Sequence, residues 1–288
     1  NKNNLSRDTV LNAFNELKNR GVIYATVGKG YYVATEDIVV EKKIFLLFDE
    51  FNSFKEDLYN SFLKALGENI QVDIFFHHFN MRVFRRLIND NLGSYNAYVI
   101  MPANLKEASL AIQSLGKESV YVLDQMHEGL GNYPGVYQNF EEDMYRGLLG
   151  GSTQIKNYQK MVMQFDANIQ PLGLLKGFES FCEEQEMHFE VIPDFDERKP
   201  KKGELYLVLD DKNLIRIIKK MHQEGLKLVR DIGIISYNET LLKEIVQGGI
   251  TTISTDFKLM GENLATMILE NKKEHIENPS SIILRKSL

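Results

Sequence analysis

The sequence is poor in residues that cross-link a chain or rigidify it: its 288 residues include one cysteine, six prolines and no tryptophan. The single thiol, Cys182, excludes a disulfide framework and a multi-cysteine zinc site. No apolar run approaches the roughly 20 residues that a membrane-spanning helix requires. The polar stretch from Asn1 to Arg7 is not followed by the apolar core of a signal peptide. These absences predict a cytoplasmic protein with no membrane partner.

Charge is unevenly distributed along the chain. The net charge is −6, which argues against a general nucleic-acid binder, and 43% of the residues are hydrophobic, which is ample for a packed core. Residues 1–36, however, contain five basic and three acidic residues, a net charge of +2, so the remainder carries −8. This difference separates a small N-terminal piece from a large acidic one.

The N-terminal piece has the pattern of one helix followed by one hairpin. Ser6 suits an N-cap, Asp8 falls in the first turn, and Gly21 suits the position just after a helix. Two β-prone runs, 22–27 and 31–33, are joined by a glycine-bearing turn and predict a hairpin. Because about 35 residues cannot bury a stable core alone, we expect this piece to be part of a larger domain.

From about residue 41 onward, apolar strands alternate with helices, which indicates parallel sheets covered on both faces. The expected strands occupy residues 43–49, 72–76, 95–101, 120–123, 159–165, 187–192, 205–209 and 232–237. Ligands of such sheets bind beyond the carboxyl ends of the strands. Several strands end in polar residues at that place, namely Asp49, Asp124, Asp210 and Asn238.

Motifs for enzymatic chemistry are missing from the sequence. It contains neither a Gly-x-Ser-x-Gly turn nor a Gly-Lys-Ser phosphate loop. The adjacent His77 and His78 would face opposite sides of a strand and would make a poor metal pair. Cys182 has no obvious base beside it and has the pattern of a packing residue. These features predict a protein that is not an enzyme and that needs no metal and no cofactor.

The N-terminal segment resembles the second half of a GntR-type winged helix. In that family a Ser-Arg-x-Thr-Val motif opens the recognition helix and a Gly-Lys-Gly turn forms the wing. The resemblance rests on Leu5-Ser6-Arg7-Asp8-Thr9-Val10, Glu16-Leu17, Gly21-Val22-Ile23 and Gly28-Lys29-Gly30-Tyr31-Tyr32-Val33. The family's first two helices have no counterpart in this sequence. The resemblance implies that a helix N-terminus and a hairpin tip contact operator DNA. The implied contact residues are Ser6, Arg7, Thr9, Asn12, Gly28, Lys29 and Gly30.

The large domain resembles the effector domain of LacI/GalR-type regulators, which is related to periplasmic sugar-binding proteins. The matching fragments are Asn52-Ser53-Phe54, Val122-Leu123-Asp124-Gln125, Gln138-Asn139, Lys176-Gly177-Phe178, Leu209-Asp210-Asp211, the run from Asp231 to Asn238, the run from Ile250 to Ile253, Asp256 and Met260-Gly261. The resemblance implies an α/β fold: a two-lobed, type I periplasmic-binding-protein-like sensor, with parallel sheets flanked by helices, preceded by a partial winged helix-turn-helix.

Domain boundaries follow from the two resemblances. Residues 1–36 are expected to form the DNA-binding piece, 37–42 a linker and 43–288 the effector domain. Three crossovers join the lobes in the LacI-type family, and by analogy we expect them near residues 156, 254 and 278. The first lobe then takes about 43–156 and 255–278, and the second about 157–254 and 279–288.

The LacI-type resemblance also implies an effector site in the cleft between the lobes. The expected contact residues are Asp49, Phe54, Asp124, Asn139, Asp210, Asn238 and Asp256. Two arginines of the family are replaced, one by Leu174 and the other by Gln125. Without these guanidinium groups a neutral monosaccharide fits better than a phosphorylated or carboxylated effector. We expect a pentose or a deoxyhexose, such as arabinose or fucose.

These observations predict a DNA-binding transcriptional regulator, a repressor of a carbohydrate-utilisation operon that a small sugar releases. The families imply a homodimer that reads a pseudo-palindromic operator. One alternative is a stand-alone solute-binding protein, which would need a secretion signal and leaves the N-terminal piece unexplained. Another is a regulator that senses a non-sugar metabolite. A Rossmann-like enzyme would need a phosphate loop or a catalytic constellation.

Overall fold

A computed structural model describes residues 9–11, 13–14, 17, 23–26, 29–34 and 42–288. The chain divides into two compact units, Asn1–Glu41 and Lys42–Leu288. Each unit is described by itself below. Among the described residues, no helix has the length and apolar character needed to cross a membrane.

The N-terminal unit contains helical residues and a hairpin. Residues 9–11, 13–14 and 17 are helical, and β1 (Ile23–Thr26) pairs antiparallel with β2 (Gly30–Val33). Gly30 takes a φ of +100° at the turn, a backbone conformation that favours glycine. The rings of Phe14 and Tyr31 lie 4.5 Å apart, so the helical segment contacts the hairpin.

The predicted DNA-contacting residues fall partly within the described chain. Thr9 lies in the helical segment, while Lys29 and Gly30 lie at the hairpin turn. The other four lie outside the described residues: Ser6, Arg7, Asn12 and Gly28.

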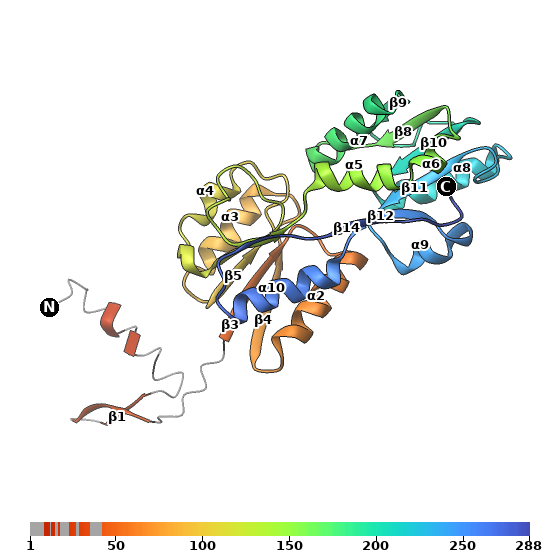
Figure 1. The fold of residues 1–288 in the computed structure, drawn as a ribbon. Coiled ribbons are helices and arrows are strands. Elements are labelled where there is room, and N and C mark those ends of the chain that lie inside the picture. The colour runs from red at the N-terminus through yellow and green to blue at the C-terminus, as the bar shows by residue number, and fades with distance from the viewer. Residues whose placement is uncertain (1–8, 12, 15–16, 18–22, 27–28, 35–41) are drawn as a thin grey trace. The chain divides into compact units, whose positions relative to one another are not determined.

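The first lobe of the large unit is built on a six-stranded parallel sheet in the order β13-β7-β6-β5-β3-β4. Four helices of this lobe cover it (Figure 1). The strands are β3 (Lys42–Phe48), β4 (Ile70–Phe76), β5 (Ala97–Ile100), β6 (Val120–Asp124), β7 (Gly135–Tyr137) and β13 (His275–Glu277). The helices are α2 (Ser53–Leu66), α3 (Met81–Asp90), α4 (Ala108–Ile112) and α10 (Phe257–Leu269).

Side-chain alternation along β3 explains why both faces of this sheet are covered. Ile44, Leu46 and Phe48 belong to the core beneath α2 and α10. Phe45 and Leu47, which alternate with them, belong to the core beneath α3 and α4. The continuous apolar run in this strand therefore indicates burial on both faces, as the sequence analysis predicts.

The second lobe has a six-stranded sheet in the order β14-β12-β11-β10-β8-β9. All neighbours are parallel except β12 and β14, because β14 returns along the sheet edge in the antiparallel sense. The strands are β8 (Lys160–Gln164), β9 (His188–Ile192), β10 (Glu204–Val208), β11 (Gly233–Tyr237), β12 (Thr251–Thr255) and β14 (Ser280–Ile283). The helices are α5 (Phe140–Gly150), α6 (Ser152–Ile155), α7 (Leu172–Glu184), α8 (Asp211–Gln223) and α9 (Leu241–Ile245).

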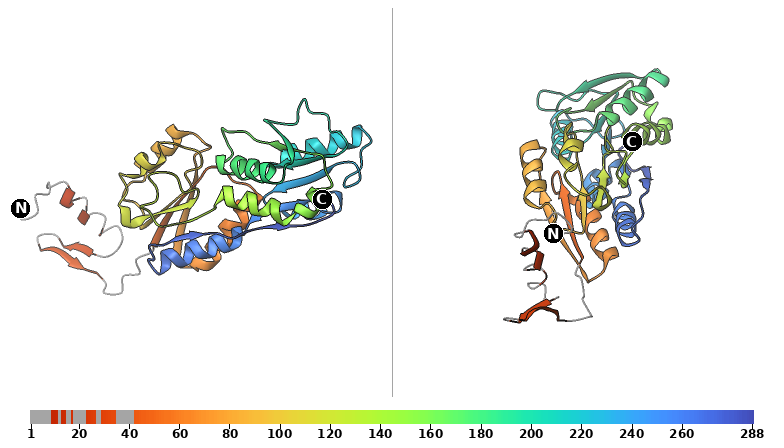
Figure 2. Two further views of the ribbon diagram at one scale, coloured as in Figure 1. Left: turned by 45° about the horizontal axis from the view of Figure 1, so that its top comes forward. Right: turned by 90° about the vertical axis from the view of Figure 1, so that its left-hand side faces the viewer.

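The two faces of the second sheet also carry separate cores. One core includes residues of α5 and α7, and the other is made largely by α8. The two lobes of residues 42–288 lie side by side, as the left-hand view of Figure 2 shows. This α/β architecture of parallel sheets flanked by helices confirms the predicted fold class of the large unit.

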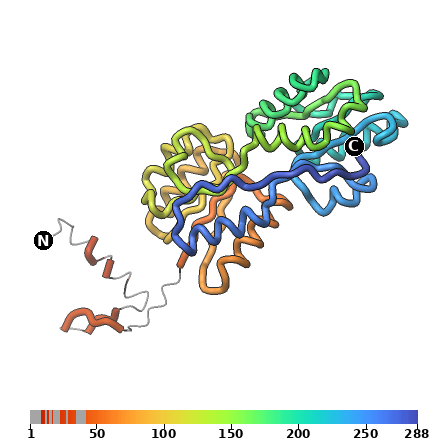
Figure 3. Tube along the Cα trace, viewed as in Figure 1, coloured from red at the N-terminus to blue at the C-terminus, as the bar shows by residue number. Residues whose placement is uncertain are grey.

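The chain passes between the lobes three times, and the passages can be followed in Figure 3. They lie between β7 and α5, between β12 and α10, and between β13 and β14. The first passage corrects the expectation of a crossover near residue 156, because α5 already packs with α7 in the core of the second lobe. Residues 140–155 therefore belong to the second lobe.

Close contact between α2 and α10 depends on Gly261. A Cβ atom added there would lie 2.2 Å from Ser61 Oγ and 2.4 Å from the carbonyl oxygen of Leu58. We expect Gly261→Ala to destabilise the protein by about 1–3 kcal/mol, because the helices must separate to admit the methyl group. Urea unfolding measures this. Gly131→Ala is the control, since an added Cβ meets no atom within 4 Å there; equal stability of both variants would contradict the prediction.

Candidate functional site

A cavity of about 290 Å³ lies between the two lobes, at the carboxyl ends of parallel strands. Both lobes and the first passage contribute to its wall. The first lobe contributes Asp49, Glu50, Asn52, Ser53, Phe54, Lys55, Phe79, Asp124 and Gln125. Gln138 and Phe140 come from the first passage and the start of α5. The second lobe contributes Ile169, Gln170, Pro171, Leu174, Leu209, Asp210, Asp211, Tyr237, Asn238 and Lys243.

Five of the seven residues expected to bind an effector line this cavity. They are Asp49, Phe54, Asp124, Asp210 and Asn238. Asp124 ends a strand, Asp49 and Asn238 directly follow one, and Asp210 lies two residues after β10. Phe54 lies in the first turn of α2. The parallel topology brings them together because it collects the ends of distant strands at one edge of each sheet.

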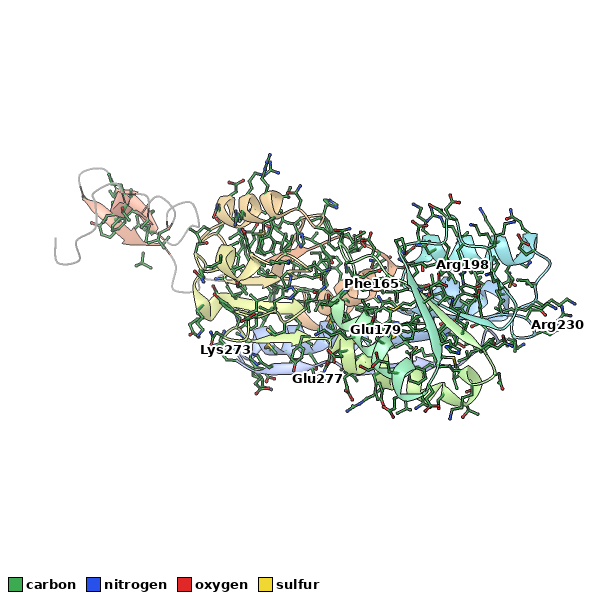
Figure 4. All side chains as sticks on the ribbon, turned by 90° about the horizontal axis from the view of Figure 1, so that it is seen from above. Phe165, Glu179, Arg198, Arg230, Lys273 and Glu277 are labelled. Carbon is green, nitrogen blue, oxygen red and sulfur yellow. The ribbon has the colours of Figure 1, made fainter. Side chains whose placement is uncertain are left out.

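Asn139 and Asp256 do not line this cavity, although Asn139 lines a second one that shares Gln138 and Phe140 with it. Asn139 is the N-cap of α5, and its side chain also donates a hydrogen bond of 3.3 Å to Glu277. Glu277 belongs to β13 of the first lobe and is labelled in Figure 4. Asp256 is the N-cap of α10 and accepts a hydrogen bond of 2.9 Å from the amide of Leu259. Both side chains cap helices that begin at lobe passages.

Lys55 is a site residue that sequence reasoning missed. Asn52 caps α2 by accepting a hydrogen bond from the amide of Lys55 at 3.2 Å, which places Lys55 in the first turn. There the ammonium group forms a buried ion pair with Asp49 and lies 5.7 Å from the centroid of the Phe54 ring. Burial of the lysine, which decides its role, has no signature in the local sequence.

Asp124 is buried at the end of β6 in an uncommon backbone conformation. Its φ of +76° is in the left-handed region, which a non-glycine residue rarely adopts. The amide of Gln138 donates a hydrogen bond to its carboxylate. Burial raises the pKa of Asp124 to about 6; the nearby Asp49 charge adds to this shift, while Lys55 opposes it. A carboxylate that can exist in either protonation state near neutral pH therefore faces the cavity.

Direct hydrogen bonds connect the lobes beside the cavity. The hydroxyl of Tyr237, in the second lobe, donates to Gln138 Oε1 at 3.2 Å. Because Gln138 in turn donates to Asp124, the two lobes share one chain of hydrogen bonds. A second connection runs from the side-chain amide of Asn104 to the carbonyl oxygen of Gln170 at 2.9 Å.

Two amide side chains in the wall have unused hydrogen-bonding capacity. Asn238 is only 9% exposed, and its Oδ1 atom has no partner among the described residues. Gln125 is also buried, and no hydrogen bond of its side chain occurs within the described part of the chain. Buried polar groups are normally paired, so these two amides are available to a ligand. Gln125 comes from the first lobe and Asn238 from the second.

The two carboxylates that the second lobe contributes to the cavity wall already interact with neighbouring protein groups. Asp210 caps α8: one of its oxygens accepts from the amide of Asn213 and the other from the Asn213 side chain, each at 2.8 Å. Lys243 is fully enclosed and forms an ion pair with Asp211 at 3.1 Å. No local pattern indicates the role of this lysine, because α9 begins several residues after the strand end that it contacts.

One asparagine connects all three lobe passages. Asn278 is 1% exposed, and its backbone amide donates to the carbonyl oxygen of Tyr137 at 2.8 Å. Its side-chain amide donates to Thr255 Oγ1 and to the carbonyl oxygen of Asp256, each at 2.8 Å. The hinge between the lobes is thus a hydrogen-bonded unit.

The histidines and the cysteine lie outside the cavity wall. Within the described ranges there is no group of three or more His, Cys, Asp or Glu side chains that could hold a metal ion. His77 is buried and its Nε2 atom lies 3.0 Å from the carbonyl oxygen of Met101. Burial raises the pKa of the Cys182 thiol to about 12, which makes it a poor nucleophile.

One parallel sheet, a second sheet that is parallel except for β14, three crossovers and a polar cavity at the strand ends define a periplasmic-binding-protein-like fold. The family model described as a periplasmic binding protein-like domain matches residues 163–288. The HTH-type transcriptional regulator KdgR of Bacillus subtilis (strain 168) is 27% identical over 137 residues. That match covers 46% of this chain and 39% of the regulator, so the chain matches well under two thirds of its relative's length.

Solved structures share the fold at low sequence identity. A LacI family transcriptional regulator from Enterococcus faecalis V583, with bound ribose, has a TM-score of 0.72 and 19% identity, covering 85% of this chain and 98% of that one. A periplasmic binding protein/LacI transcriptional regulator from Alkaliphilus metalliredigens QYMF, complexed with D-xylulofuranose, has a TM-score of 0.69 and 10% identity, covering 85% and 98%. These likenesses show that the large unit shares the fold of those proteins.

The raised pKa of Asp124 predicts a pH-dependent stability. Folding raises this pKa from an ordinary 3.8 to about 6, so the folded state holds the proton more tightly and stability falls as pH rises through this range. Asp124→Asn has no charge at this position at either pH. Its free energy of unfolding, relative to that of the wild type, should therefore increase by about 1 kcal/mol from pH 5 to pH 8. Urea unfolding at both pH values tests this, with the exposed Asp90→Asn as control. If the difference in unfolding free energy between Asp124→Asn and the wild type does not increase with pH, the prediction is wrong.

Proposed function

We propose that this chain is part of a DNA-binding transcriptional regulator, a repressor of a carbohydrate-utilisation operon, whose operator affinity a small neutral sugar controls. The observation that carries the proposal is the cavity between the lobes, where the side chains of Gln125 and Asn238, one from each lobe, are buried and Asn238 Oδ1 has no partner among the described residues. Sugar-bound relatives with the same fold support it. Under this proposal the protein is a binding protein and not an enzyme.

The chemistry of the wall favours an uncharged, hydroxyl-rich ligand. Hydrogen-bond acceptors predominate, including Asp49, Asp124 and Asn238, and sugar hydroxyls can donate to all of them. The two lysines of the wall are already paired with carboxylates, so neither offers a free charge to an anion. Aromatic rings such as Phe54 can pack against a sugar face. The volume of about 290 Å³ suits a monosaccharide, and we favour a pentose or deoxyhexose such as arabinose or fucose.

Effector binding would act through the hinge. A ligand that contacts Gln125 of the first lobe and Asn238 of the second stabilises one arrangement of the lobes over others. It can shift this equilibrium only by its difference in affinity for the arrangements. The domain division belongs to the same proposal: residues 1–36 read DNA, 37–42 link and 43–288 respond to the effector.

The DNA-binding half of the proposal rests on the GntR-like motifs. Lys29 and Gly30 lie at the turn of the β1–β2 hairpin, where a wing would present them to DNA. A homodimer would bring two such segments to the two halves of a pseudo-palindromic operator. A regulator of a non-sugar metabolite, or a stand-alone solute-binding protein, are the alternatives that ligand screening and DNA binding must exclude.

Gln125→Ala tests the effector site. We expect the wild type to show a thermal shift with one or more of arabinose, fucose and ribose, and the variant to bind that sugar about tenfold more weakly, because a buried hydrogen bond to the ligand is lost. Calorimetric titration measures both affinities. The exposed Gln113→Ala is the matched control. A shift with a purine or an amino acid, and with no sugar, would overturn the sugar proposal.

Arg7→Ala tests the DNA-binding segment. We expect loss of binding to operator DNA taken from the gene's own upstream region, because a bidentate contact to guanine contributes about 1–3 kcal/mol. Sugar binding should be unchanged, since it belongs to the other unit. Electrophoretic mobility shift and calorimetry give the two readouts, with Lys117→Ala in the large unit as control. Parallel loss of DNA and sugar binding would contradict the domain division.

A further inference from the structure

The ammonium group of Lys243 is fully used within the second lobe. Lys243 is 2% exposed, and its Nζ atom donates to the carbonyl oxygens of Tyr237 and Asn238, each at 2.8 Å. The third partner is the carboxylate of Asp211 at 3.1 Å. An ammonium group has three donors, so none remains for a ligand although the residue lines the cavity.

These three bonds connect two loops that follow neighbouring strands. Tyr237 ends β11 and Asn238 follows it, whereas Asp211 begins α8 just after β10. The two strands pair in parallel, with Val208 opposite Ser236. Lys243 therefore connects the segments that follow the carboxyl ends of β10 and β11. These two segments together form one wall of the cavity.

The turn that Lys243 holds is in an uncommon backbone conformation. Asn238 has a φ of +61°, in the left-handed region that few residues other than glycine adopt, and asparagine is among those that tolerate it best. Its backbone amide donates to the carbonyl oxygen of Ile253 at 2.8 Å, and its carbonyl oxygen accepts from Lys243. Its backbone amide and carbonyl groups are thus both hydrogen-bonded, and its side-chain Oδ1 is buried with no partner in the described part of the chain.

We propose that Lys243 is the positioning residue of the effector site: it holds Asn238 in the left-handed conformation, so that the side-chain oxygen can accept a hydrogen bond from an effector hydroxyl. This inference rests on the proposed function for the identity of the ligand, but its geometric part does not. Lys243 itself does not touch the effector. Its charge serves instead to offset the carboxylate of Asp211 and the two carbonyl dipoles.

Lys243→Met removes the donors and keeps much of the side-chain volume. In the ligand-free protein, we expect hydrogen–deuterium exchange to accelerate at least tenfold in residues 209–213 and 237–243, with exchange in the first lobe unchanged. Asp211→Asn retains both carbonyl bonds, so its faster exchange should be confined to 209–213. Lys212→Met, an exposed neighbour on α8, is the matched control and should behave as wild type. Unchanged exchange in residues 237–243 of Lys243→Met would overturn the proposal.

Sugar affinity gives the second readout, with D-ribose and L-arabinose as the probes. Lys243→Met and Asn238→Ala should each weaken binding about tenfold, and the double variant should bind no more weakly than either single variant, because both remove the same contact. A role confined to stability would give additive losses or none, and would refute the proposal. If the wild type binds neither sugar, the sugar proposal fails, and the exchange measurement still decides whether Lys243 positions Asn238. If Lys243→Met does not fold, Lys243→Gln, which loses the charge and is too short to keep all three bonds, replaces it in both measurements, and unchanged exchange in residues 237–243 would again overturn the proposal.

Discussion

Burial of charge at the strand ends is the constraint on which the cavity depends. Each lobe places one lysine inside: Lys55 against Asp49 in the first, and Lys243 against Asp211 in the second. An unpaired buried charge is costly, so each pair must keep its geometry once it is enclosed. The lysines thereby fix the loops that carry the exposed polar atoms of the wall. What remains for a ligand is a set of uncharged amides and partly satisfied carboxylates.

The hinge also depends on a small number of shared hydrogen bonds. Asn278 bonds to both of the other passages, so the three passages share one set of hydrogen bonds. Beside the hinge, the chain from Tyr237 through Gln138 to Asp124 connects the lobes across the cavity. A ligand that binds there meets polar groups already engaged between lobes. Under the proposed function, a ligand that competes for those groups would favour a different arrangement of the lobes.

Much of the fold could be predicted from the chain because parallel sheets leave a strong local signal. Runs such as Ile44 to Phe48 are apolar at every position, and only strands covered on both faces require this. The first lobe passage could not be predicted in this way. The amphipathic pattern of α5 would fit a helix of either lobe. Only its packing against α7 assigns it to the second lobe. Strand β7, with three residues, is too short to be recognised by periodicity.

The sequence by itself determined which polar residues stand at strand ends, since Asp49, Asp124, Asp210 and Asn238 are adjacent to strands that the hydrophobic pattern reveals. The tertiary structure decided which polar residues reach the cavity. Asn139 and Asp256 became helix caps instead, and Lys55 and Lys243 acquired their roles through enclosure. The physical reason is that a side chain's partners depend on long-range packing. A strand end is a local property, whereas burial and pairing are set by segments distant in the chain.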